Sequence, residues 1–142
     1  MAEPGPGPFP IKVRYADTDA QGHVFFANYF IYFDEALTCY LEAIGVPYPK
    51  FSELGIDFLY AEAQCQYKGS AGPGETIKVD ARVGRIGHSS LTFQCAIRRQ
   101  GSEELIADGH VTAVVVDPKT RQPMRVPNEI REAVAKFGQG KE

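Results

Sequence analysis

The sequence has 142 residues, of which 44% are hydrophobic and 23% are charged, and its formal net charge is -3. This length and composition fit one ordinary globular domain with its own core. A weakly acidic chain lacks the broad positive field that neutralises phosphates, so we expect no nucleic-acid partner.

No segment is typical of export or of a membrane protein. The run 1–8 is rich in Gly and Pro and lacks the basic and apolar regions of a signal peptide, and no apolar stretch reaches bilayer length. Free, buried thiols are favoured over a metal site by the wide separation of Cys39, Cys65 and Cys95. We therefore expect a cytoplasmic protein without membrane insertion and without a bound metal.

The N-terminal quarter predicts an arm, a strand and a polar loop. Gly and Pro exclude a helix or central strand from residues 1–8, which we expect to form a flexible arm. The alternation over 11–15 predicts a strand, and the turn formers of 16–22 follow it.

One long helix is predicted over residues 28–44, which contain neither Gly nor Pro and carry apolar residues at helical spacing. Gly45 and Pro47 are placed to end it. Apolar side chains cover most of its circumference, which predicts a helix that is buried on nearly all sides.

Four long strands are predicted after the helix, over 57–68, 76–86, 90–99 and 105–116. Their alternation indicates that one face of the sheet meets a core. In the first strand the predicted core-facing residues are Leu59, Ala61, Ala63, Cys65 and Tyr67. Short, turn-rich links favour antiparallel pairing of consecutive strands as a meander.

Residues 129–137 predict a short C-terminal helix that ends at Gly138, with 139–142 as a tail. The order of the elements predicts an α+β fold, in which a curved antiparallel sheet wraps around the long helix. Residues 9–138 would form this single domain.

The segment 14–29 is the most suggestive of chemistry, because a loop with two acids opens into the start of the long helix. The first N–H groups of a helix have no partner within it and lie at the positive end of its dipole. Such donors stabilise the oxyanion that forms when a carbonyl is attacked. Gly22 permits a tight turn between Asp19 and the helix.

The pattern D-x-D-x-x-G-x-V-x-x-x-N-Y over 17–29, followed by Phe-Asp-Glu-Ala at 33–36, resembles the 4-hydroxybenzoyl-CoA thioesterase family of hotdog-fold proteins. The likeness spans roughly residues 9–137 and includes the run 85–93. It implies the hotdog fold and hydrolysis of an acyl-CoA thioester to free acid and CoA, with no cofactor beyond the substrate's own CoA.

By this resemblance Asp19 is the catalytic carboxylate, acting as nucleophile or as general base, and the Phe26 N–H polarises the thioester carbonyl. Asp17 would be structural, and turn formation or helix capping is the alternative role for both acids. His23 is a secondary candidate for substrate contact or proton transfer. Glu35 is the alternative catalytic carboxylate, because some hotdog thioesterases draw theirs from the helix.

Family position also favours Arg85, His88 and Ser89 as contacts for the CoA phosphates, with Ser90 as a pantetheine or backbone partner. Solvated surface charge is the alternative for these residues. A set of aromatic residues could line an acyl pocket or simply belong to the core: Phe25, Phe26, Tyr29, Tyr32, Phe58 and Tyr60.

The resemblance further implies a homo-oligomer, in which a second copy covers an exposed sheet edge beside the active-site loop. A dimer is the minimum and a tetramer is expected. The competing function is a non-catalytic module that binds acyl-CoA or another small ligand. Asp19 favours the enzyme, because a binder has no need for an acid beside a helix start. The acyl group, and CoA as opposed to a carrier protein, stay open.

Overall fold

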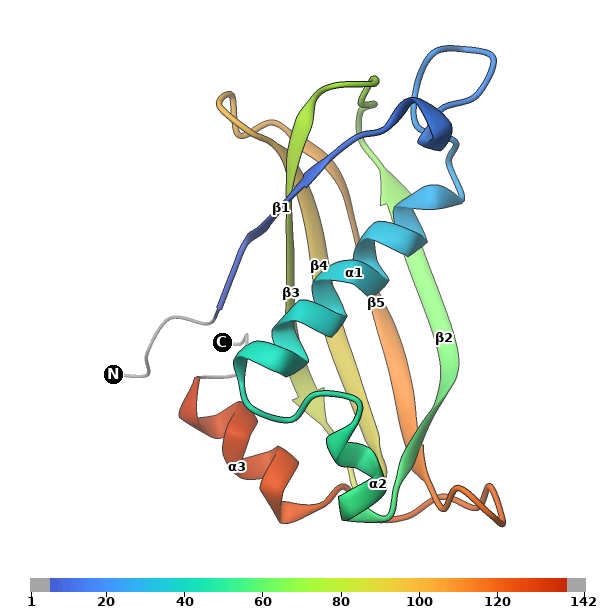
Figure 1. Ribbon diagram of the computed structural model, residues 1–142, viewed down its shortest axis with the longest axis vertical. Helices are drawn as coiled ribbons and strands as arrows, with labels where there is room; N and C mark the ends of the chain where they lie inside the picture. The colour runs from blue at the N-terminus through green and yellow to red at the C-terminus, as the bar shows by residue number, and fades with distance from the viewer. Residues whose placement is uncertain (1–5, 138–142) are drawn as a thin grey trace.

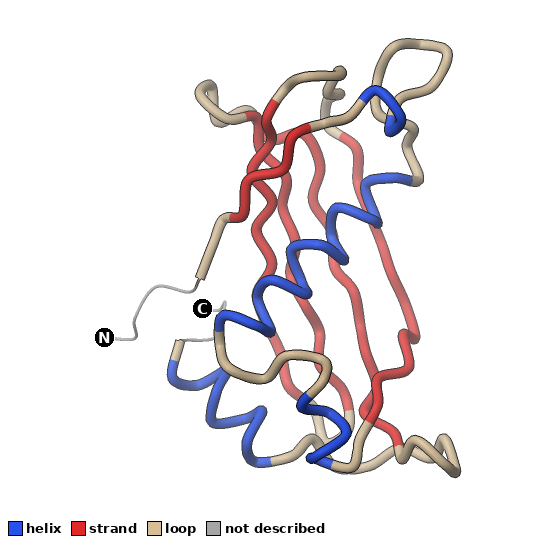
Figure 2. Tube along the Cα trace, in the orientation of Figure 1, coloured by secondary structure: helices blue, strands red, loops and turns tan. Residues whose placement is uncertain are grey.

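A computed structural model describes residues 6–137. A long helix lies across one face of a five-stranded sheet (Figure 1), and two short helices lie near one end of it (Figure 2). The elements are β1 (Phe9–Lys12), a 3-10 turn (Tyr15–Asp17), α1 (Asn28–Ala43), α2 (Lys50–Leu54), β2 (Asp57–Tyr67), β3 (Thr76–Ile86), β4 (Ser90–Arg99), β5 (Leu105–Val116) and α3 (Asn128–Lys136). Residues 1–5 of the expected arm, Gly138 and the tail 139–142 lie outside the described residues.

The sheet order is β1-β3-β4-β5-β2, and every neighbouring pair is antiparallel. The meander is therefore confirmed for β3, β4 and β5, but the expected pairing of β2 with β3 is wrong. Because β1 occupies the free edge of β3, with Ile11 opposite Ile77, β2 pairs instead with β5 at the other end of the sheet.

The first strand covers Phe9–Lys12 rather than the predicted 11–15, and residues 15–17 form a 3-10 turn. Pro10 is compatible with β1 because this strand lies at the sheet edge and pairs on one side only.

The predicted long helix is confirmed, but the prediction that it is buried on nearly all sides is wrong. The sheet covers one side of α1, whereas Ile31, Asp34, Glu35 and Thr38 outside that contact are exposed. Full burial of a large apolar side chain contributes about 1.5–3 kcal/mol. The side chains of α1 that supply this core are Tyr29, Tyr32, Phe33, Ala36, Leu37, Tyr40 and Leu41.

A bulge in β2 changes which side chains face α1. The register shifts between Tyr60 and Glu62, which leaves Ala61 without a partner residue on β5. Tyr60 before the bulge and Ala63 after it both lie against α1, so Leu59 and Ala61 do not face the core as predicted. Ala63 and Tyr67 remain exposed, because β2 is an edge strand that α1 only partly covers.

The two short helices close one end of the sheet (Figure 1). The C-terminal helix, predicted over 129–137, is confirmed as α3, which buries Ile130 and Val134. The sequence did not predict α2, which buries Phe51 against Phe58 with 4.6 Å between their ring centroids. Within residues 6–137, no helix has both the length and the apolar character needed to span a bilayer.

Substitution of Gly109 tests how closely the backbones of β5 and β2 pack in the sheet. This glycine lies opposite Cys65 of β2 and Cys95 of β4, and a Cβ atom there would collide with the backbone carbonyl oxygen of Gln64. We expect Gly109→Ala to lower the free energy of unfolding by about 2–3 kcal/mol in urea denaturation. Gly84→Ala is the control, because its Cβ would meet the exposed side chain of Gln94, which can rotate away. Equal losses in both variants would contradict this account.

Candidate active site

The loop between β1 and α1 projects beyond the N-terminal end of α1 (Figure 1). Backbone hydrogen bonds close it from both sides: the Phe25 N–H donates to the Asp17 carbonyl at 2.9 Å, and Thr18 forms a bridge with Val24. The loop is also tied to the segment before β3, because the Val24 N–H donates to the Ala71 carbonyl at 2.9 Å. The backbone of Asp17 is thus held next to the first turn of α1, and Asp19 follows two residues further along the same loop.

The Asp17 side chain is buried and its carboxylate is fully engaged. It accepts hydrogen bonds from the Arg14 backbone N–H at 3.1 Å, the Arg14 guanidinium at 2.8 Å and the Tyr32 hydroxyl at 2.9 Å. Burial alone would raise the pKa of this carboxyl group, but the hydrogen bonds from Arg14 and Tyr32 outweigh it and hold the pKa below its ordinary value. This geometry is that of a structural ion pair.

Asp19 has a different environment two residues later. Its backbone N–H donates to the His23 carbonyl at 3.0 Å, and its carbonyl accepts from the Gly22 N–H at 2.9 Å, so 19–23 form a tight turn. Gly22 has a φ of 78°, which favours glycine. One carboxylate oxygen, Oδ1, accepts from the Gln21 N–H at 2.9 Å, and the other has no donor among residues 6–137. His23 is exposed at the loop surface.

The first turn of α1 offers backbone donors. The Asn28 N–H donates to the Phe25 carbonyl at 2.8 Å, which makes the N–H groups of Phe26 and Ala27 the first of the turn. Neither group has an acceptor within the described part of the chain, and no side chain caps the helix. Such a turn is suited to hold a developing oxyanion.

Tyr67, at the end of β2, lies beside this turn, although no sequence motif predicted a functional role for it. Its hydroxyl donates to the Phe26 carbonyl at 2.9 Å, and its ring lies edge-on to those of Phe26 and Tyr29, at 6.3 and 5.4 Å between centroids. The contact joins residues 41 positions apart. No local sequence signal could have found it.

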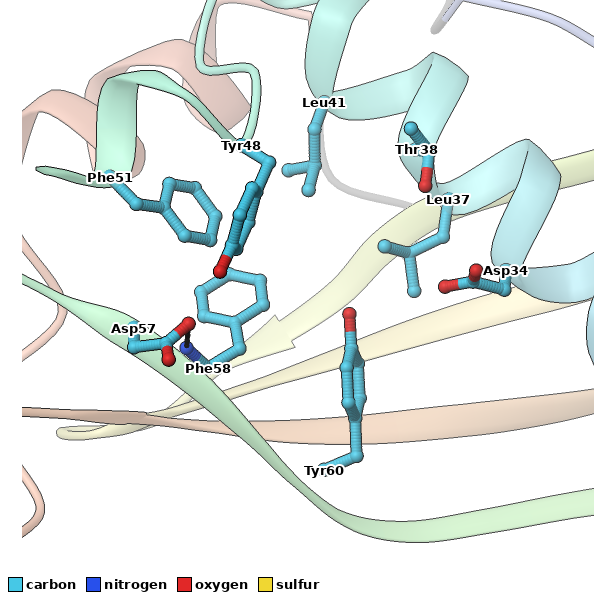
Figure 3. Close-up of a pocket in the computed structure, with 9 residues that line it drawn as sticks. All are labelled: Asp34, Leu37, Thr38, Leu41, Tyr48, Phe51, Asp57, Phe58 and Tyr60. Atoms are coloured by element: carbon cyan, nitrogen blue, oxygen red, sulfur yellow. Dashed lines mark hydrogen bonds between the residues drawn. The ribbon is translucent and has the colours of Figure 1, made fainter. Parts of the chain in front are cut away.

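A groove runs between α1 and β2. Its part next to the helix start is mainly apolar and is lined by Phe30, Asp34, Leu37, Tyr60, Ala63 and Val111. It continues into a cavity of about 340 Å³ (Figure 3), where the Tyr60 hydroxyl points toward α1. Burial, reinforced by the charges of Asp34 and Asp57, raises the pKa of Tyr60 to about 12, so this hydroxyl stays neutral.

Of the predicted pocket aromatics, Phe58 and Tyr60 line this groove, whereas Tyr29 and Tyr32 are buried in the core. Phe25 and Phe26 are 42% and 61% exposed beside the loop. Glu35 lies on the flank of α1 next to β1, in a hollow that it shares with Lys12, Arg14 and Asp17. The groove and Glu35 therefore face different sides of the helix.

The residues expected to contact CoA lie at the far end of the sheet. The loop between β1 and α1 packs at the start of β3, where the Val13 N–H donates to the Glu75 carbonyl at 2.8 Å. Arg85 is near the other end of this 11-residue strand, and His88 to Ser90 follow it. At about 3.3 Å per residue the two ends are separated by about 33 Å. One chain does not bring these residues to its own Asp19.

The turn at the far end is held by α3 and by the segment before it. The Arg131 guanidinium donates to the Gly87 carbonyl at 2.8 Å, and the Val126 N–H donates to the His88 carbonyl at 2.8 Å. Residues 6–137 contain no group of three or more His, Cys, Asp or Glu side chains that could hold a metal ion.

The model of the thioesterase-like superfamily matches residues 13–134, which is most of the chain. The chain belongs to this superfamily. The match, together with the sheet order and the central helix, confirms both the family and the α+β hotdog fold that the sequence predicted.

Some proteins that are similar to this chain are named as CoA thioesterases. Acyl-CoA thioesterase YbgC of Haemophilus influenzae is 25% identical over 126 residues, which cover 88% of this chain and 91% of the relative. The structure of DHNA-CoA thioesterase from Staphylococcus aureus has a TM-score of 0.82 at 25% identity, over 90% of this chain and 87% of that one. These likenesses support a thioester hydrolase as the enzyme class.

A further structure shows the fold alone. Slr0204 of Synechocystis, a 1,4-dihydroxy-2-naphthoyl-CoA thioesterase, has a TM-score of 0.84 to this chain at 18% identity. The alignment covers 91% of this chain and 95% of Slr0204.

The structural role of Asp17 can be tested by Asp17→Ala. The variant should lose about 1–3 kcal/mol of unfolding free energy, because the buried Tyr32 hydroxyl and the Arg14 N–H lose their acceptor. Since the folded pKa of Asp17 is lowered, its ionic contribution is present above about pH 4 and is lost as the pH falls through the folded pKa. Urea denaturation at several pH values and fixed protein concentration should show the two proteins converging in acid. A constant difference would argue against the ion pair.

Proposed function

We propose that the chain hydrolyses acyl-CoA thioesters, with Asp19 as the reacting carboxylate and the Phe26 N–H as an oxyanion donor. The observation that carries the proposal is the uncapped first turn of α1, whose N–H groups lack acceptors in residues 6–137, next to a loop with a partly free carboxylate. Membership of the thioesterase-like superfamily supports it. Asp17 is unsuited to the role because its carboxylate is already engaged.

Two routes fit this geometry. As nucleophile, Asp19 adds to the thioester carbon, the C–S bond breaks, CoA leaves as thiolate, and water then cleaves the mixed anhydride. As general base, Asp19 takes a proton from water, whose oxygen adds to the same carbon before the C–S bond breaks. In both routes the carbonyl oxygen gains negative charge and the Phe26 N–H stabilises it.

The groove between α1 and β2 is the best place for the acyl group. It begins at Phe30, one turn after the candidate oxyanion donor, and continues along α1 to Leu41. These 11 helical steps correspond to about 16 Å. The apolar part near Phe30 would receive the first carbons of the acyl group, and Asp34 and Tyr60 line the deeper part.

A second copy of the chain would complete the site. β2 is an edge strand of 11 residues without proline, and its exposed apolar side chains include Leu59 and Tyr67. Such an edge is suited to pair with another chain. Antiparallel pairing about a two-fold axis brings the far end of one sheet toward the active-site loop of the other. The turn at 87–89 of the second copy would then approach the CoA, and two such dimers would make the expected tetramer.

The competing proposal is a module that binds an acyl-CoA without turning it over. Such a module would use the groove but would not depend on the charge of Asp19. Release of CoA thiol from a panel of acyl-CoAs, followed continuously, separates the two functions. An absence of turnover with every thioester would leave the binding module as the better proposal.

Asp19→Asn tests the catalytic carboxylate. We expect kcat to fall by about 100-fold or more, because the amide is neither a nucleophile nor a base, while the affinity for acyl-CoA stays close to that of the wild type. Glu35→Gln is the matched control and should keep its activity. If Glu35→Gln is inactive and Asp19→Asn is not, the carboxylate of α1 takes the role instead.

Leu59→Lys tests the edge as an assembly surface. Leu59 is 45% exposed on β2, and a lysine there places a charge on the apolar edge. We expect the wild type to sediment as a dimer or tetramer. The variant should already be dissociated at concentrations at which the wild type is still assembled, with an unchanged circular dichroism spectrum. A wild type that sediments as a monomer at micromolar concentration would refute the two-chain site.

A further inference from the structure

We infer that Tyr67 is a positioning residue for thioester hydrolysis: its hydroxyl orients the peptide between Phe26 and Ala27, so that the Ala27 N–H becomes a second donor to the thioester oxygen. The inference rests on the proposed function, because it assumes that a carbonyl oxygen binds at the start of α1. It adds a residue from β2 to a site otherwise built from the loop and the helix.

The peptide that joins Phe26 to Ala27 is held by its oxygen. In a trans peptide the C=O and N–H point in opposite directions in one plane, so fixing the oxygen also fixes the direction of the N–H. The bond from Tyr67 to the Phe26 oxygen measures 2.9 Å, whereas the helical bond from the Tyr29 N–H to the same oxygen measures 3.4 Å. The latter is long for an N–H donor, so Tyr67 is the tighter anchor.

The neighbouring peptide needs no such help. The Phe25 carbonyl, which shares a peptide with the Phe26 N–H, accepts from the Asn28 N–H at 2.8 Å. The peptide before it is fixed as well, because the Phe25 N–H donates to the Asp17 carbonyl at 2.9 Å. The Phe26 N–H is therefore oriented by short backbone bonds alone. Ala27 differs, because the direction of its N–H depends on a side chain from another element.

Tyr67 itself is well fixed. It is paired with Ala107 of β5, and its ring lies edge-on to Phe26 and Tyr29. A hydrogen bond to a carbonyl also polarises the peptide, which strengthens the N–H at its other end. The hydroxyl thus orients and strengthens the same donor.

Tyr67→Phe removes the hydroxyl and keeps the ring. We expect kcat to fall about 5- to 10-fold with KM unchanged, because the lost bond acts on the transition state and not on the bound ground state. Tyr15→Phe is the control, since Tyr15 is 84% exposed and its hydroxyl has no hydrogen-bond partner among residues 6–137. It should match the wild type in kcat and in thermal stability.

A second variant shows whether Tyr67 acts through Ala27. Replacing Ala27 by lactic acid turns its N–H into an ester oxygen with little change of shape, and should lower kcat by about 10-fold or more. If the inference holds, Tyr67→Phe has little further effect in this background. Independent, multiplicative losses would assign Tyr67 a purely structural role and overturn the inference.

A spectroscopic measurement separates this inference from the proposed function. A dethia-CoA ketone with a ¹³C-labelled carbonyl should show a lowered C=O stretching frequency on the wild type, and a smaller shift on Tyr67→Phe. If the wild type turns over thioesters but Tyr67→Phe equals it in kcat and in the carbonyl shift, the inference fails alone. If the wild type neither turns over thioesters nor shifts the carbonyl frequency, the proposed function fails, and the inference fails with it.

Discussion

The uncapped start of α1 is the constraint on which the candidate site depends. Most helices satisfy their first N–H groups with a Ser, Thr, Asp or Asn side chain, and losing such a cap costs about 1 kcal/mol. Here the N-cap is Ala27, which follows the apolar residues Phe25 and Phe26, and no side chain caps the turn. The turn is instead held from outside, by Asp17 and Tyr67, through bonds to Phe25 and Phe26 that leave the two N–H groups available.

The two acids of the loop show how burial divides similar residues between different roles. Asp17 and Asp19 are two positions apart, and local sequence offers the same turn-forming reading for both. Asp17 is enclosed by Arg14 and Tyr32, which hold it ionised and fully bonded. Asp19 stays at the loop turn, where its carboxylate accepts one bond. A reacting carboxylate needs a free oxygen, and Asp19 keeps one.

Local pattern predicted the elements well and their neighbours less well. The bounds of β3, β4 and β5 match the predicted 76–86, 90–99 and 105–116, because alternation and short turns are local features. The placement of β2 was missed, since it depends on which strand β1 pairs with, and β1 lies more than 60 positions before its partner. The contact between Tyr67 and Phe26 was invisible for the same reason. The catalytic role predicted for Asp19 rested on the family motif over residues 17–29, because hydrophobic alternation and helical spacing do not distinguish Asp19 from Asp17.

The edge strand β2 connects assembly with chemistry. Its end at Tyr67 reaches the first turn of α1, its middle forms one wall of the groove, and its outer edge is open to another chain. Pairing that edge would stiffen the strand along its length, because a free edge has ladder bonds on one side only. A second copy would then do more than bring its distant turn near the CoA. By holding β2, it would also hold Tyr67, and through Tyr67 the peptide that we propose stabilises the oxyanion.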